Sequence, residues 1–107
     1  MILGQYVVIT GHGGPKNALY FIFDTENRSF SNAFIGTHLV WQYDDLSTAA
    51  YVDGSNILSI DGRTLAELDL AENEYVYGLS YSQDGTVLTA TIVSSEETER
   101  IIRLTLP

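Results

Sequence analysis

The residue types that most often carry chemistry are scarce in this sequence. It contains two histidines, His12 and His38, and no cysteine. No His-x-x-x-His spacing is present, so a zinc site would need several carboxylates to complete it. We therefore predict neither a metal site nor a cofactor.

One glycine-rich segment could place a histidine beside backbone amides. His12 lies in the run Gly11-His12-Gly13-Gly14, where an exposed base could face an oxyanion nest. No G-x-S-x-G nucleophile motif accompanies it, and no helix follows to make a phosphate site. We favour a wide loop over an active site, and we predict that the chain is not an enzyme.

Aspartates recur at the predicted turns. Asp53, Asp61 and Asp84 each precede a glycine, and Asp44 stands next to Asp45. Their spacing does not match a calcium-binding loop, whereas Asp-Gly pairs are typical of tight turns. Adjacent residues of an extended chain point to opposite faces, which argues against a paired-carboxylate hydrolase at Asp44 and Asp45.

The remaining candidates are side chains for binding. Fourteen acidic residues against five basic ones give a net charge of −9, so we expect no nucleic-acid partner. The acidic groups form either a solvated face or a docking surface for a basic partner. Tyr and Trp are enriched at binding hot spots, although cross-strand pairing could also explain them. The candidate binding residues are Trp41, Asp44, Asp45, Glu67, Asp69, Glu72, Glu74, Tyr75 and Tyr77.

Short strands and turns must position these residues, because helical periodicity is nearly absent. The best helical candidate, Leu65 to Ala71, follows an Asp-Gly turn and reads better as part of a strand. Residues 29–35 and 37–43 read as two separate strands. In residues 75–82, alternation predicts Tyr75, Tyr77, Leu79 and Tyr81 on one face. The fold class we predict is all-β, with antiparallel meanders of about ten short strands.

A repeat of about forty residues organises the chain. Trp41 and Tyr81 are 40 positions apart, as are Asp44 and Asp84. A period of this length is typical of stacked four-stranded units. We expect one domain, 1–107, with units of about 5–36, 37–74 and 75–107.

Two segments carry a family resemblance. Residues 41–45 (Trp-Gln-Tyr-Asp-Asp) and 81–85 (Tyr-Ser-Gln-Asp-Gly) resemble the aromatic-Ser-x-Asp-Gly turn of β-propeller blades, of the WD-repeat and bacterial envelope type. The sequence departs from that family because it lacks a Trp-Asp dipeptide and has Asp45 where glycine is usual. The resemblance implies about two and a half blades of a non-catalytic, protein-binding propeller in the extracytoplasmic part of a bacterial protein.

A complete propeller needs at least about 160 residues, more than this chain has. The chain would then be a segment of a larger envelope or sensor protein, would self-associate through edge strands, or would pack as a sandwich, which we favour. We detect no signal peptide, and we expect no direct membrane insertion because no apolar run is long enough.

We predict a non-catalytic module that binds a protein partner with a basic surface. One alternative is a carbohydrate- or peptidoglycan-binding module that uses the surface aromatics. Another is a small acidic inhibitor or immunity-type protein that blocks a basic enzyme. Salt should weaken binding to a basic partner but should barely affect stacking on sugar.

Overall fold

The computed structural model describes residues 2–12, 17–31, 33–42 and 45–105. These residues form antiparallel β-strands and no helix, so the predicted all-β fold of about ten short strands is confirmed. The strands are β1 (Ile2–Leu3), β2 (Tyr6–His12), β3 (Ala18–Asp24), β4 (Ser29–Phe30), β5 (Phe34–Gln42), β6 (Asp45–Asp53), β7 (Asn56–Ser59), β8 (Thr64–Glu67), β9 (Glu74–Tyr81), β10 (Val87–Ser94) and β11 (Glu99–Thr105). In the described part of the chain, no helix is long and apolar enough to span a membrane.

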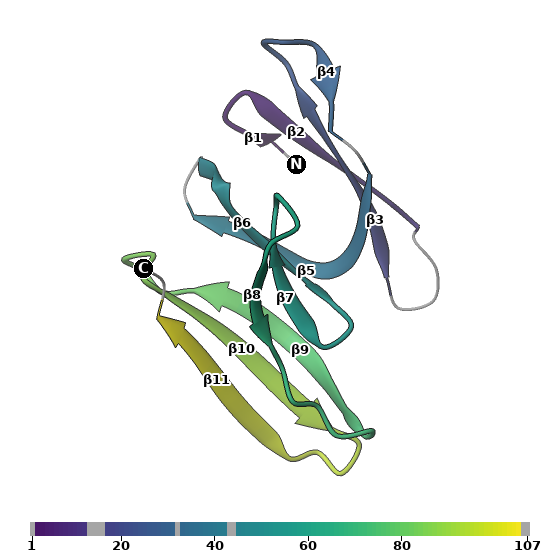
Figure 1. Ribbon diagram of the computed structural model, residues 1–107, viewed down its shortest axis with the longest axis vertical. Helices are drawn as coiled ribbons and strands as arrows, with labels where there is room; N and C mark the ends of the chain where they lie inside the picture. Colours follow the sequence, from purple (N-terminus) through teal and green to yellow (C-terminus); the bar gives the residue numbers. More distant parts are fainter. Residues whose placement is uncertain (1, 13–16, 32, 43–44, 106–107) are drawn as a thin grey trace.

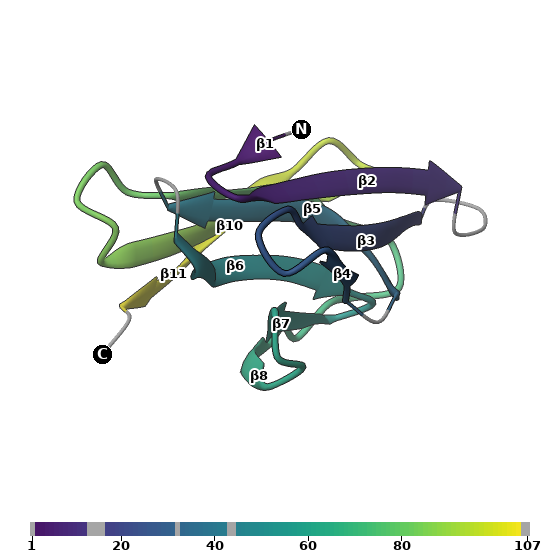
Figure 2. The same ribbon diagram turned by 90° about the horizontal axis from the view of Figure 1, so that it is seen from above.

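The strands form two sheets, each with neighbours that follow one another along the chain. The larger sheet has the order β1-β2-β3-β5-β6-β7-β8, with β4 paired to β3, and the smaller has the order β11-β10-β9 (Figure 1). Figure 2 shows β2 at one side of the larger sheet and β7 and β8 at the other, with β3, β5 and β6 between them. Successive antiparallel pairing is what short turns between strands favour.

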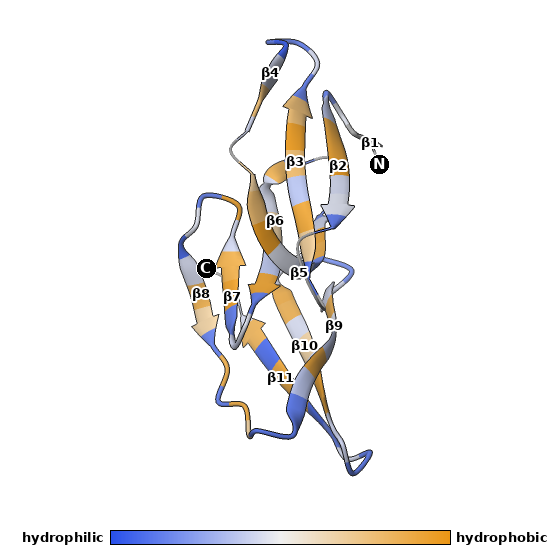
Figure 3. Ribbon diagram, turned by 90° about the vertical axis from the view of Figure 1, so that its right-hand side faces the viewer, coloured by the Kyte–Doolittle hydropathy of each residue, from blue (hydrophilic) through white to orange (hydrophobic). Residues whose placement is uncertain are grey.

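Two apolar clusters stabilise the packing of these sheets. The main cluster lies between the second half of the larger sheet and the smaller sheet, and it includes the fully buried Ile57 and Leu88. Full burial of such a side chain contributes about 1.5–3 kcal/mol. A second cluster around Val8, Tyr20 and Ile22 holds the N-terminal strands together. Figure 3 shows the apolar colour on the strands and the polar colour mostly at the turns between them.

Strand β5 connects the two parts of the larger sheet and differs from the sequence prediction. Residues 29–35 and 37–43 were predicted to be separate strands, but β4 has two residues and β5 runs without a break through Gly36. Gly36 pairs with Ala18 of β3, and the next residue, Thr37, pairs with Val52 of β6. The glycine marks a close approach of two strands, which its sequence position alone does not distinguish from a strand break.

Strand β9 contains a one-residue bulge. Thr91 of β10 lies opposite Gly78, and Ile92 lies opposite Val76, so Tyr77 has no opposite residue in the β9–β10 ladder. An extra residue of this kind reverses the side-chain alternation on either side of it.

The predicted alternation of β9 is therefore wrong. Tyr75 and Tyr77 precede the change and point to solvent, whereas Leu79 is buried and Tyr81 packs against the main cluster. The bulge separates four side chains that the period-two pattern had placed on one face.

Candidate binding groove

A groove of about 840 Å³ lies beside the first half of β9. We call it the β9 groove. Its walls include β5 with His38, the β6–β7 turn with Gly54, the link before β9 with Glu72, and β9 itself with Tyr75 and Tyr77. Four of the predicted binding residues, Glu72, Glu74, Tyr75 and Tyr77, thus line one groove.

Tyr75 and Tyr77 are the exposed large apolar side chains of the β9 groove. Tyr75 is 53% exposed and Tyr77 is 67% exposed. Val76 between them is buried in the main cluster, and this anchors the strand that presents both rings. A ring held in this way offers a large contact area at a small entropic cost on binding.

His38 joins β5 to the edge of β9. Its backbone has a φ of 57°, in the left-handed region, and its Nε2 lies 3.1 Å from the carbonyl oxygen of Val76. A carbonyl oxygen only accepts hydrogen bonds, so Nε2 carries the donated proton in this contact. The imidazole therefore holds β5 against β9.

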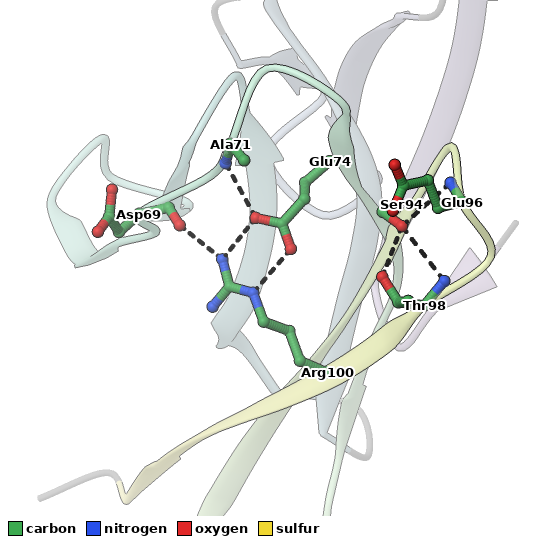
Figure 4. A network of polar contacts seen from close by, with 7 residues as sticks. All are labelled: Asp69, Ala71, Glu74, Ser94, Glu96, Thr98 and Arg100. Carbon is green, nitrogen blue, oxygen red and sulfur yellow. Dashed lines mark hydrogen bonds and ion pairs between the residues drawn. The ribbon is translucent and has the colours of Figure 1, made fainter.

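Glu74 belongs to a polar network at the far end of the small sheet (Figure 4). Arg100 of β11 donates from Nε to Oε2 at 2.9 Å and from a terminal nitrogen to Oε1 at 3.0 Å. The Ala71 amide donates to Oε1 at 2.9 Å, and the carbonyl oxygen of Asp69 accepts from Arg100. These bonds, first of all those from Arg100, lower the pKa of Glu74 to about 2.

The carboxylates at the mouth of the groove therefore have different roles. Glu74 is held by Arg100 within the chain, whereas Glu72 is exposed and forms no ion pair among the described residues. Glu72 is the acidic group of the groove that is available to a ligand.

The other predicted binding residues lie outside the β9 groove. Trp41 is half-buried against the N-terminal cluster. Asp45 is exposed and accepts hydrogen bonds from the Ser47 amide and hydroxyl at 3.0 and 2.6 Å. Glu67 and Asp69 are exposed on β8 and the link that follows it. Asp44 lies outside the described residues.

Some groove residues were missed in the sequence. Thr37 and Ser95 line the groove, yet neither is close in sequence to Glu72, Tyr75 and Tyr77. Only the pairing of β9 with β10 and the position of β5 beside it bring them together. The sequence gives one indication of the bulge in β9, which is Gly78, because a glycine within a strand often marks a bulge.

The Ser-x-Asp-Gly turns, in contrast, have a purely local explanation. The Asp84 carboxylate accepts hydrogen bonds from the hydroxyls of Ser82 and Thr86 at 2.7 and 2.8 Å and from the Thr86 amide. These bonds lower the pKa of Asp84 to about 2. Asp61 is bonded similarly to Ser59 and to the Arg63 amide. Both aspartates shape their own turns.

Two further kinds of site were considered from the sequence, a metal site and a catalytic loop at His12. They contain no group of three His, Cys, Asp or Glu side chains arranged to hold a metal ion. His12 is exposed at the end of β2, while Gly13 and Gly14 of the proposed amide nest lie outside the described residues.

Comparisons of the chain with protein-family models, with curated proteins and with solved structures found no match. The functional interpretation therefore depends on the side chains of the groove and on their surroundings. Those side chains are suited to contact and to charge recognition.

Proposed function

We propose that this chain is a non-catalytic module that binds a protein partner in the β9 groove. One observation carries the proposal: Tyr75 and Tyr77 are 53% and 67% exposed, next to each other on a strand that the core anchors. Exposed tyrosines on a rigid support are typical of binding hot spots. The described rings that pair with one another do not include these two.

The charge around the groove favours a basic partner. Glu72 is exposed at the groove, and Glu67 and Asp69 are exposed nearby along the chain. A Lys or Arg side chain could pair with Glu72 while it lies over the face of a tyrosine ring. The net charge of −9 would also steer a basic protein toward this chain.

The arrangement of the strands is compatible with blade-like units. Strands β5–β8 form one antiparallel meander and β9–β11 form another, and they begin close to residues 37 and 75. This arrangement supports a propeller-like segment, and the sequence resemblance alone is the basis for proposing that it belongs to a larger bacterial envelope or sensor protein outside the cytoplasm. In such a segment, unpaired edge strands would serve for association with neighbouring units or with other copies.

A peptide selection tests the binding proposal. A displayed library of random twelve-residue peptides is selected on the wild-type chain, and the enriched peptides are titrated against a Tyr75→Ala/Tyr77→Ala double variant. We expect basic peptides whose affinity falls at least about tenfold in this variant and decreases as NaCl is raised. A Phe30→Ala variant is the control, because Phe30 is 63% exposed but lies outside the groove. Equal binding to the double variant would overturn the proposal.

The same two tyrosines support carbohydrate binding as a second candidate function. Chitohexaose, a neutral oligosaccharide, is the probe for this alternative. Binding that is lost in Tyr75→Ala/Tyr77→Ala but does not respond to NaCl would identify a sugar-binding module and would replace the basic protein partner. The inhibitor alternative instead requires inhibition of a basic nuclease, with steep salt dependence.

A further inference from the structure

The outer edge of β11 in the smaller sheet pairs with no other strand among the described residues. β11 is the outer strand of the order β11-β10-β9, and Figure 1 shows it in yellow at the edge of the molecule. It has seven residues, whereas the outer strands of the larger sheet, β8 and β1, have four and two. A long edge strand offers a row of backbone groups to another strand.

The register shows which backbone groups of β11 face outward. The Ser94 amide donates to the Thr98 carbonyl at 2.9 Å, and the same register continues into the β10–β11 ladder. Directly opposed residues of an antiparallel pair alternate between hydrogen-bonded and non-hydrogen-bonded pairs. Hence Arg100, Ile102 and Leu104 direct their backbone groups toward β10, and the alternate residues of β11 direct theirs to the open edge. The outward residues are Glu99, Ile101, Arg103 and Thr105.

The outward residues also share the exposed face of β11. Ile101 is 46% exposed, and Glu99 and Arg103 are exposed, while Ile102 and Leu104 pack against the main cluster. Glu99 and Arg103 are four residues apart, or about 13 Å along a strand, so they cannot pair within one β11. Neither forms an ion pair with another described residue.

We infer that two copies of this chain associate through their β11 strands, antiparallel and centred on Ile101. This register places Ile101 opposite the second copy's Ile101, and Glu99 opposite the second copy's Arg103 on both sides of the two-fold axis. All of these residues have outward backbone groups, so they form hydrogen-bonded pairs. The result is a continuous six-stranded sheet with one apolar pair and two complementary charge pairs at its centre.

Charge distribution and size determine how strong this dimer is. Two of the five basic residues of the chain, Arg100 and Arg103, are in β11, so with Glu99 this strand has a net charge of +1, which reduces the repulsion between two copies of net charge −9 that meet there. An edge contact of seven residues buries less area than a standard stable interface. The dimer is therefore weak and depends on protein concentration.

A cysteine cross-link tests the register directly, because the chain has no cysteine of its own. In an Ile101→Cys variant, the two introduced side chains are on α-carbons about 5.5 Å apart, which is within disulfide range. We expect mild oxidation to give a covalent dimer in good yield. A Thr105→Cys variant is the matched control, because its two sites are about 26 Å apart in this register and remain uncross-linked.

Charge reversal tests the same contact without a covalent bond. Sedimentation equilibrium is measured for the wild type and for Glu99→Arg, Arg103→Glu and the double variant. Each single change sets like charges opposite one another twice, so dimer affinity falls about tenfold or more, and the double variant restores it. Glu67→Arg, the same change on the edge strand β8, is the control and leaves the dimer unchanged.

Three results would overturn the inference: a wild type that remains monomeric at millimolar concentration, equal cross-linking at positions 101 and 105, or a double variant that stays as weak as the single ones. β9 and β11 are opposite edges of the small sheet. The dimer and the binding proposal can therefore fail independently, because the tyrosine variants do not change β11.

Discussion

The Glu74 carboxylate was predicted to bind a partner, but it forms hydrogen bonds within the chain. It accepts two hydrogen bonds from Arg100 and one from the Ala71 amide. Its side chain is 15% exposed, compared with 41% for that of Arg100. The contact joins the start of β9 to the start of β11, so it orders both edges of the small sheet.

The pKa of Glu74 gives a testable pH dependence. It lies at about 2 in the folded chain, below the ordinary value of 4.5. A carboxyl group whose pKa is lowered by folding stabilises the fold above the ordinary value, and this contribution is lost as the pH falls toward the folded value. Between about pH 4.5 and pH 2, the melting temperature should therefore decrease less steeply in Glu74→Gln than in the wild type. Glu72→Gln serves as the control, and an unchanged slope in Glu74→Gln would contradict the structure.

At the scale of the elements, two glycines have opposite roles in neighbouring strands. A β-carbon added to Gly36 of β5 would lie 2.6 Å from the Tyr51 ring and 2.6 Å from the Val52 carbonyl oxygen. A β-carbon added to Gly78 of β9 would meet nothing within 4 Å. The first glycine lets β5 approach β6 closely, whereas the second needs no such space.

Alanine substitutions separate these roles. Gly36→Ala should destabilise the fold by about 1–3 kcal/mol, because the β5 and β6 backbones must move apart. Gly78→Ala should be neutral or stabilising by up to about 1 kcal/mol, because alanine loses less backbone entropy on folding. Urea denaturation measures both changes. Similar midpoints for the two variants would show that β5 does not approach β6 as described.

At the scale of the whole molecule, the chain is elongated and strongly acidic. The radius of gyration is 14.2 Å, compared with about 13 Å for an average domain of this length. The principal extents are 46 × 33 × 21 Å, and the core is divided into two clusters. The net charge of −9 adds repulsion that an elongated shape only partly relieves.

Salt should therefore stabilise this chain. We expect the melting temperature to rise when NaCl is increased from about 20 to 200 mM, because the screening length becomes short enough to weaken repulsion between acidic residues. A Glu67→Lys/Glu96→Lys variant, which reduces the net charge to −5, should show a smaller increase. A melting temperature that falls with salt in the wild type would instead mean that attractive ion pairs dominate.

The sequence by itself determined the class of fold and the turns. β-Branched and aromatic residues in short runs, separated by Asp-Gly pairs, were enough to predict an all-β chain. The Asp61-Gly62 and Asp84-Gly85 turns follow from hydrogen bonds within five residues of each aspartate. Such features are readable from sequence because their physical causes are local.

Only the tertiary structure decided which of the candidate residues face a ligand. The bulge at Tyr77 turned Tyr75 and Tyr77 outward and Leu79 inward, because one extra residue reverses every later side chain of a strand. Arg100, 26 residues away, engaged the Glu74 carboxylate. Register and long-range pairing arise from contacts between distant strands, and no local pattern in the chain encodes them.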